Sequence, residues 1–243
     1  MNENLIKNSF WISGKFTVLE IIKRSKRKIV QIVIHEKNKD YLSKVRINNI
    51  PLKLESDKFF NKLFKNDLDI HQGFAALVMS LPKIDLNEKI KKIEKNSIFL
   101  ILDGIRDSRN IGSIIRSAAA LGCDAIVIEQ KNYNPKSNLM FRAASGMTEH
   151  IDIIPVSNIT NCITLLKKNN FWVYGMSADA KTDLKNIQFP NRSAFVFGSE
   201  TNGIKNLVEK NCDELVKIKI NKEVESLNIS NAVAITLAIA NKY

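Results

Sequence analysis

The sequence predicts an α/β protein in which helices cover both faces of a parallel sheet, preceded by a smaller α+β domain. From Ser97 onwards, short apolar runs alternate with helical segments, which is typical of parallel strands joined by helical crossovers. These runs are nearly continuous rather than interrupted by polar residues, which indicates strands buried on both faces. A polar, Lys-rich bridge at 82–96 (PKIDLNEKIKKIEKN) reads as a linker or an exposed helix. We therefore predict a domain at 1–80, a linker at 81–96 and a larger domain at 97–243.

Each element is predicted from its local pattern. Before the bridge, residues 14–25 (GKFTVLEIIKRS) resemble a helix and residues 28–36 (KIVQIVIHE) a strand. In the larger domain we expect strands at 97–104, 125–130, 150–156, 171–178, 193–200 and 215–220, and helices at 108–122, 137–145, 158–170 and 226–242. Ligands of such sheets bind beyond the carboxyl ends of the strands, so polar residues there are candidates for a site.

The composition narrows the class of partner. The chain of 243 residues has a formal net charge of +12, which favours a polyanion. Nucleic acid is preferred over membrane, because no segment pairs a basic face with a strongly apolar one. No apolar run is long enough to span a bilayer, and the first residues lack the pattern of a signal peptide, so we expect a cytoplasmic protein.

The cysteines and histidines point to no metal chemistry. Cys123, Cys162 and Cys212 are far apart, so we expect free thiols. The three histidines are equally scattered, and no zinc site can be assembled from their spacing.

The first polar cluster at a strand end runs from Asp107 to Gly112 and leads into Arg116. Asn110 can cap the helix that follows, and Gly112 removes a side chain from its first turn. Arg116 is the only charged residue from Ile111 to Gly122, where its neighbours Ile114, Ile115 and Ala118 are suited to burial. The alternative to a functional site is a helix cap followed by an arginine whose head reaches solvent.

The second and third clusters are also open to two interpretations. At 195–204 (FVFGSETNGI) a strand breaks into a loop where Gly198 and Gly203 allow backbone to approach a ligand, although an ordinary turn has the same residues. The spacing is neither a Walker loop nor a dinucleotide fingerprint. At 218–235, four polar residues crowd before an apolar helix, where one cap would suffice: Ser226, Asn228, Ser230 and Asn231.

Taken together, the clusters resemble the SpoU (TrmH-like) family of RNA ribose 2′-O-methyltransferases. The family's three motifs occur in order: N-x-G-x-x-x-R at 110–116, G-S-E-x-x-G at 198–203 and E-S-L-N-x-S at 225–230. The segment 144–150 (ASGMTEH) is similar to that of the RlmB group, which methylates guanosine in 23S ribosomal RNA. GKFTVLEII and HQGF are similar to the small, L30e-like substrate-binding domain of those enzymes.

The resemblance implies a methyl donor, S-adenosylmethionine, a trefoil knot at the C-terminus, a homodimer and an RNA substrate. It also implies no metal. By the resemblance the catalytic side chains fall on Arg116, Asn110, Glu200, Ser226 and Asn228. Positions whose backbone would bind the donor fall on Gly198, Ile218 and Leu227.

Four positions depart from the family pattern. Ser108 and Lys219 stand where prolines are usual, and Thr201 and Lys222 where glycines are usual. Three of these changes touch the loops that would hold the donor, so they bear on its binding. They leave the five candidate side chains intact.

The role of Arg116 has two versions. The resemblance implies a general base, but a guanidinium keeps its proton up to a pH of about 12, which favours a clamp on the phosphate beside the target ribose. A basic run in the first domain, Lys23, Arg24, Lys26, Arg27 and Lys28, either contacts RNA or is a solvated face.

Three other functions compete with methylation of ribosomal RNA. One is the same chemistry on transfer RNA. Another is a non-catalytic RNA-binding or ribosome-assembly protein with a degenerate donor site. A nucleotide-dependent α/β enzyme lacks any phosphate-loop signature.

Overall fold

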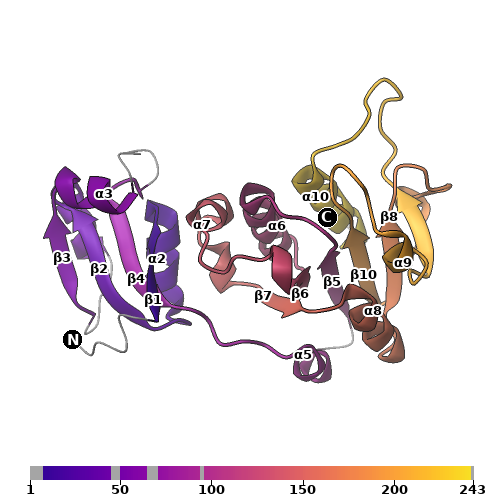
Figure 1. Cartoon of the computed structure of the whole chain (residues 1–243), viewed down its shortest axis with the longest axis horizontal. Helices are drawn as coiled ribbons and strands as arrows, with labels where there is room; N and C mark the ends of the chain where they lie inside the picture. The colour runs from indigo at the N-terminus through magenta and orange to yellow at the C-terminus, as the bar shows by residue number, and fades with distance from the viewer. Residues whose placement is uncertain (1–7, 45–49, 65–70, 94–95, 242–243) are drawn as a thin grey trace. The chain divides into compact units, whose positions relative to one another are not determined.

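A computed structural model of the chain describes residues 8–44, 50–64, 71–93 and 96–241. The chain folds into two compact units (Figure 1). The first unit combines Met1–Pro82 with Asn134–His150, and the second combines Lys83–Tyr133 with Ile151–Tyr243. Within the predicted bridge, Leu86–Lys92 forms helix α5, whereas residues 94 and 95 lie outside the described residues.

The first unit is built on a four-stranded mixed sheet with the strand order β1-β4-β2-β3. Strand β4 pairs antiparallel with β1 and β2, and β3 pairs parallel with β2. Its elements are β1 (Ser9–Ser13), α2 (Lys15–Arg24), β2 (Ile29–His35), the 3-10 helix η1 (Glu36–Lys44), β3 (Leu52–Glu55), α3 (Asp57–Phe64) and β4 (Phe74–Met79). The unit is α+β, as predicted.

Helix α2 forms where apolar residues recur at helical spacing. Val18, Ile21 and Ile22 are buried, whereas Lys23 and Arg24 follow at the exposed end. The helix ends at Ser25, whose backbone is left-handed with φ of 52°.

The segment Asn134–His150 folds with the first unit although it follows a strand of the second. Its helix α7 (Asn138–Ala144) and 3-10 turn η3 (Met147–Glu149) pack against β1 and α2. The Thr17 hydroxyl of α2 donates to the Phe141 carbonyl at 3.1 Å. The fold of the first unit therefore includes the A-S-G-x-x-E-H segment.

Arg27 is buried against that segment and is not an exposed member of the basic run. Its guanidinium lies 2.6 Å from Glu149, and the two side chains are 3% and 0% exposed. A buried carboxylate needs such a partner. The exposed members of the run are Lys23, Arg24, Lys26 and Lys28.

The second unit contains a seven-stranded sheet with the order β7-β6-β5-β10-β8-β11-β9, and its neighbouring strands pair in parallel. The strands are β5 (Ser97–Leu102), β6 (Ala125–Glu129), β7 (Asp152–Val156), β8 (Trp172–Met176), β9 (Thr182–Asp183), β10 (Arg192–Phe197) and β11 (Glu214–Lys217). Besides α5, the helices are α6 (Ser108–Ala120), α8 (Ile159–Lys168), α9 (Asn206–Glu209) and α10 (Ile229–Ala240), with 3-10 turns η2 (Gln130–Asn132) and η4 (Leu184–Asn186).

Helices cover both faces of this sheet, as predicted. Phe99 and Ile101 of β5 share a core with Ile163 of α8 and with α5. Side chains alternate along a strand, so Leu100 faces the other side, where α6 buries Ile115. Helices α6 and α10 pack together on that side (Figure 1). The carboxyl ends of the strands are thereby left open to loops.

The predicted strands and helices of this unit are present, but several of their ends differ from the prediction by two or three residues. The strand expected at 193–200 ends at Phe197, and the helix expected at 226–242 begins at Ile229. The strand expected at 215–220 ends at Lys217. Its edge neighbour β9 pairs only with Val216 and Lys217, so the residues after them have no ladder to continue. Residues between β11 and α10 instead project as a long loop (Figure 1). The trefoil knot remains a prediction.

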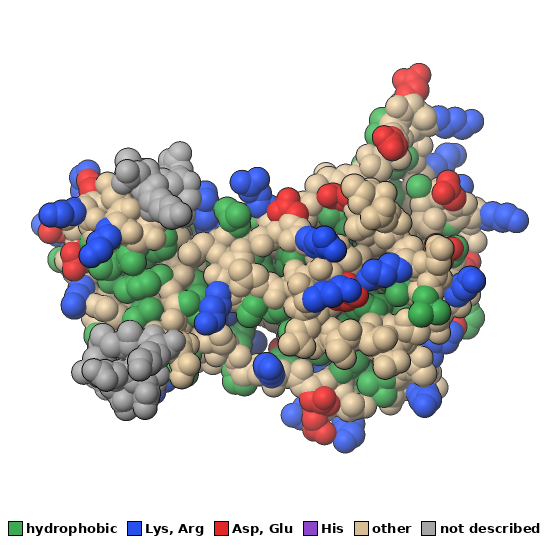
Figure 2. Space-filling view, in the orientation of Figure 1, with side chains coloured by type: hydrophobic (Ala, Val, Ile, Leu, Met, Phe, Trp, Pro, Cys, Tyr) green, Lys and Arg blue, Asp and Glu red, His purple; other side chains and the backbone are tan. Residues whose placement is uncertain are grey.

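Basic side chains are spread over the face of the molecule that Figure 2 shows. On the face in Figure 2, Lys and Arg side chains are distributed over both units, with Asp and Glu among them. In the part of the chain that the structure describes, no helix is long and apolar enough to cross a membrane. The net charge alone therefore does not locate a binding surface.

Candidate functional site

A pocket of about 320 Å³ lies at the carboxyl ends of β5 and β10. Two segments supply nearly all of its wall, the loop from β5 into α6 and the loop that follows β10. The lining residues are Asp103, Gly104, Ile105, Arg106, Asp107, Asn110, Ser199, Glu200, Thr201, Asn202, Gly203, Lys205 and Ile229. This position agrees with the rule for open parallel sheets.

Helix α6 begins one turn before the residue that we predicted as its cap. The N-cap is Asp107, whose carboxylate accepts from the Arg109 N–H at 2.8 Å. Asn110 therefore does not cap the helix and lies in its first turn. Aspartate and asparagine are both good caps, and the earlier one is used. The Asn110 side chain is consequently available for contacts across the pocket.

Asn110 joins the three sequence motifs. Its amide nitrogen donates to Glu200 Oε1 at 2.8 Å, and its Oδ1 accepts from Asn228 Nδ2 at 3.2 Å. Asn228 is itself the N-cap of α10, where its Oδ1 accepts from the Ser230 N–H at 2.9 Å and from the Ser230 hydroxyl at 2.6 Å. One hydrogen-bonded chain thus runs from α10 through α6 to the loop after β10.

The loop after β10 is a closed turn. Ser199 and Gly203 exchange two backbone hydrogen bonds, of 3.0 and 2.9 Å. A Cβ at Gly198 would lie 1.9 Å from the Gly203 carbonyl carbon, so only glycine fits there. Gly203 has φ of 61°, in the left-handed region, and its missing Cβ points into open space. The two predicted glycines thus have different roles, one in close packing and one in turn geometry.

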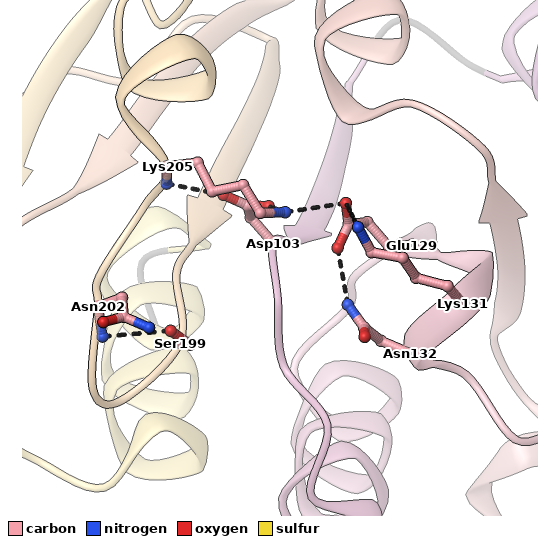
Figure 3. A network of polar contacts seen from close by, with 7 residues as sticks. All are labelled: Asp103, Glu129, Lys131, Asn132, Ser199, Asn202 and Lys205. Atoms are coloured by element: carbon pink, nitrogen blue, oxygen red, sulfur yellow. Dashed lines mark hydrogen bonds and ion pairs between the residues drawn. The ribbon is translucent and has the colours of Figure 1, made fainter.

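An ion network anchors the far end of this loop (Figure 3). The Lys205 ammonium lies 2.5 Å from Asp103 Oδ1 and 2.8 Å from Glu129 Oε1, and the Lys205 N–H donates to Asp103 Oδ2 at 2.9 Å. Lys131 Nζ lies 3.4 Å from Glu129 Oε1, and Asn132 donates to Oε2 at 2.7 Å. The network connects the ends of β5 and β6 to the pocket loop.

The network favours the charged forms of Glu129 and Lys205. Burial opposes ionisation of Glu129, but the hydrogen bond and charge of Lys205, with help from Lys131, outweigh it and lower the pKa of Glu129. Burial likewise disfavours the Lys205 ammonium, but hydrogen bonds to Asp103 and Glu129 outweigh it and raise the pKa of Lys205. Lys205 is therefore a structural cation and not a proton acceptor.

The other predicted site residues lie outside the pocket lining. Arg116 is exposed farther along α6, and Ser226 is exposed in the loop between β11 and α10. Ile218 and Leu227 are half-buried at the two ends of that loop. The structure therefore places Asn110 and Glu200 in the pocket wall, with Asn228 hydrogen-bonded to Asn110 and Gly198 directly before the lining residue Ser199. The remaining four predicted residues do not line the pocket.

The sequence reading missed the ion network. Asp103 directly follows the buried strand β5 and Glu129 ends β6, so a search for carboxylates at strand ends could have found both. Lys205 carries no comparable signal, because nothing in the sequence distinguishes it from the many other lysines.

The described residues contain no cluster of His, Cys, Asp and Glu suited to a metal ion. The three cysteines are free, as predicted, and burial raises the pKa of each thiol to about 12. The thiols are therefore protonated and unreactive at neutral pH.

Comparison with known proteins gives two matching family models. The SpoU rRNA Methylase family matches residues 97–238, and a model described as RNA 2′-O ribose methyltransferase substrate binding matches residues 11–83. A Staphylococcus epidermidis protein assigned to the TrmH family of tRNA/rRNA methyltransferases is 34% identical over 207 residues, covering 82% of this chain and 83% of that protein.

A second relative and a solved structure extend the comparison. The 23S rRNA (guanosine-2′-O-)-methyltransferase RlmB of Xanthomonas axonopodis pv. citri is 32% identical over 170 residues, covering 69% of this chain and 68% of that protein. The SpoU methyltransferase AviRb from Streptomyces viridochromogenes, crystallised with AdoMet, has the same fold with a TM-score of 0.80. It is 18% identical, and the match covers 99% of this chain and 95% of that one.

Proposed function

Because the chain belongs to the SpoU rRNA methylase family, we propose that it transfers a methyl group from S-adenosylmethionine to a ribose 2′-hydroxyl of RNA. The observation that carries the proposal is the hydrogen-bonded chain from Glu200 through Asn110 to Asn228. Residues from three separate sequence motifs meet there, at the edge of the sheet where ligands of such folds bind.

The loop after β10 fits a donor held by backbone. Gly198 and Gly203 carry no side chains, so the backbone of this loop is accessible to a ligand. The volume of the pocket is within the usual range for a small ligand, roughly 300–1,000 Å³. Gly198, Ile218 and Leu227 are the backbone positions that we assign to the donor. Bound S-adenosylmethionine supplies a methyl group made electrophilic by its sulfonium charge.

The side chains of the site orient the ribose and help its hydroxyl to lose a proton. Asn110 and Asn228 fix the positions of α6 and α10, and Glu200 is held by Asn110 at the mouth of the pocket. We assign Ser226 to a hydrogen bond with the substrate. Arg116 is the essential cation, as a clamp on the neighbouring phosphate or as the base.

We favour a guanosine of 23S ribosomal RNA as the substrate, which is the substrate named for the RlmB relative. The A-S-G-x-x-E-H segment at 144–150 supports this choice, because it resembles the corresponding segment of the RlmB group. Transfer RNA is the second candidate, since the name of the S. epidermidis relative includes both RNAs. An enzyme acting on either RNA would work in the cytoplasm.

We further propose a homodimer formed through α10. Nine of its twelve residues are apolar, yet Ile235 is 37% exposed and several neighbouring alanines are only half-buried. An apolar helix that is not fully covered by its own chain is suited to packing against a second copy. Analytical ultracentrifugation of the protein and of Ile235→Glu tests this: the variant should be monomeric.

The test of activity uses labelled methyl donor, purified protein and unmodified RNA, with ribosomal RNA, its precursors and transfer RNA in separate reactions. We expect label in large-subunit RNA at linkages that resist alkali. Arg116→Ala should abolish the label, whereas Arg109→Ala should keep most of it. Arg109 is the matched control because it is an exposed arginine on the same helix but outside the family motif.

The other possible results of this experiment distinguish ribosomal RNA methylation from the alternative functions. Label in transfer RNA alone would keep the chemistry and change the substrate. Label in no RNA, with no binding of the donor measured by calorimetry, would support a non-catalytic RNA-binding protein. Near-normal activity of Arg116→Lys would exclude the bidentate clamp, because lysine keeps the charge but loses the planar fork.

A further inference from the structure

Phe16 is the most exposed aromatic side chain among the described large hydrophobic residues, with 63% of its surface accessible. It lies in the first turn of α2, where the next two residues, Thr17 and Val18, are buried. The ring therefore adds little to the core of the first unit. Such a ring on a surface is available to a partner.

A cation lies beside this ring. The Lys15 ammonium is 5.9 Å from the centroid of Phe16 and 4.0 Å from that of Tyr41, and it donates to the Tyr41 hydroxyl at 2.6 Å. These neighbours are neutral, and the structure records no ion pair for Lys15 among the described residues. Its positive charge is therefore not offset by a nearby carboxylate in direct contact.

An exposed amide completes the cluster. Gln72 is exposed, has a left-handed backbone with φ of 50°, and accepts the Lys15 N–H on Oε1 at 3.1 Å. The Asn38 side-chain amide donates a hydrogen bond to the Gln72 backbone carbonyl at 3.1 Å. A glutamine rarely adopts this backbone conformation, and such residues cluster at functional positions. The bond to Lys15 uses only the oxygen, so the Gln72 amide nitrogen keeps its capacity to donate.

We propose that Phe16, Lys15 and Gln72 form a recognition surface for an unpaired nucleotide of the RNA substrate. The base stacks on Phe16, Lys15 pairs with a phosphate, and the Gln72 amide donates to the edge of the base. This inference rests on the proposed function, because it assigns part of the RNA recognition to residues inside the segment matched as substrate binding, 11–83.

RNA fits this surface better than a protein does. The net charge of +12 favours a polyanion, and one ring flanked by a cation and an amide offers little apolar area for a protein interface. The base must be unpaired, because bases within a duplex are already stacked on their neighbours.

The test measures binding of the full-length protein to two end-labelled RNAs by fluorescence anisotropy. One is an unpaired oligonucleotide, and the other is a fully paired hairpin of the same composition. Phe16→Ala should weaken binding of the unpaired RNA by about 5- to 150-fold and leave the hairpin nearly unchanged. Phe16→Tyr, which keeps a ring, should bind as the wild type does. Lys15→Gln should reduce the slope of log Kd against log salt by about one.

The matched control is Leu54→Ala. Leu54 is also an exposed apolar residue of the first unit, at 44%, but it lies on the edge strand β3. Its replacement should leave both affinities unchanged. Thermal unfolding of Phe16→Ala and Leu54→Ala should match that of the wild type, since both side chains are exposed.

Unchanged affinity of Phe16→Ala for unpaired RNA would overturn the proposal. Equal losses in Phe16→Ala and Phe16→Tyr would also overturn it, because stacking needs only the ring. Methyl transfer separates this result from the proposed function: Phe16→Ala should raise KM for RNA and leave kcat unchanged. If RNA binding depends on Phe16 but the wild-type protein transfers no methyl group, the proposed activity is refuted and the proposed recognition surface is retained.

Discussion

Replacing Lys205 by methionine should destabilise the second unit and loosen the pocket loop. Methionine keeps the length and apolar stem of the side chain but removes the ammonium group. In the structure that group is shared between Asp103 and Glu129, at 2.5 and 2.8 Å. The Asp103 carboxylate is fully buried. In the variant it would keep the hydrogen bond from the Lys205 backbone N–H but lose its ion pair.

The magnitude follows from the burial of the partners. Removing one member of a buried ion pair costs about 3–5 kcal/mol. The Lys205 side chain is itself 49% exposed, so water already screens part of the interaction. We therefore expect a loss of about 2–3 kcal/mol in the free energy of unfolding. For a chain of this size that corresponds to a fall in Tm of about 4–12 °C.

Circular dichroism at neutral pH measures the unfolding, and calorimetry measures binding of the methyl donor. Lys210→Met is the control, because Lys210 is an exposed lysine just after α9 with no recorded ion pair among the described residues. Adding Asp103→Asn to Lys205→Met should recover part of the stability, since it removes the unpaired buried charge. A Tm for Lys205→Met equal to that of the control would refute this reasoning.

Three further predictions concern the same two units. Glu129 has a folded-state pKa below its ordinary 4.5, so its contribution to stability is complete above that pH and is lost as the pH falls through the lowered value; the difference in Tm between wild type and Glu129→Gln should shrink in that acid range. Gly198→Ala places a Cβ against the Gly203 backbone, so donor binding measured by calorimetry should weaken more than roughly tenfold, whereas Gly203→Asn, which tolerates a left-handed backbone, should retain it. Arg27→Met leaves Glu149 buried and unpaired, which should cost about 3–5 kcal/mol in urea unfolding; a loss no larger than that of Lys23→Met would contradict this.

The periodicity of the sequence predicted the sheet of the second unit well because its strands are buried on both faces. Continuous apolar runs such as 97–102 and 193–197 are recognisable without knowing their partners. The strands at the β11–β9 edge of the sheet are harder to predict, because β9 has only two residues and β11 ends where β9 ends. The length of an edge strand depends on its neighbour, which local patterns do not contain.

The placement of the segment 134–150 could not be predicted from local pattern. Its short helix α7 was expected, but its contacts with α2 and β1 depend on residues more than a hundred positions away. The same limit explains the error at Arg27. A run of basic residues normally lies in solvent, and only the position of Glu149 shows that one member is buried.

The candidate site was predictable where one residue had to satisfy a backbone rule: Gly198 was singled out by its loop, and Asn228 was one of four candidate caps before α10. It was less predictable where two good caps compete, as Asp107 and Asn110 do in the first turn of α6. The meeting of Asn110 with Glu200 is a contact across ninety residues. The resemblance assigned both residues to the site, but neither it nor the spacing predicted this hydrogen bond.

The site has two polar layers with different physical roles. The inner layer, Asp103 with Lys205 and Glu129, joins strand ends to the loop, and its two carboxylates are buried in ion pairs with Lys205. The outer layer, Asn110 with Glu200, is exposed, and exposed hydrogen bonds contribute little to stability because water replaces them at small cost. Because breaking these hydrogen bonds costs little free energy, Asn110 and Glu200 can exchange them for hydrogen bonds to a ribose or to the methyl donor. The two layers therefore have different roles. The buried ion pairs hold the loop after β10 in place, whereas the side-chain amides at its surface can rearrange when a ligand binds.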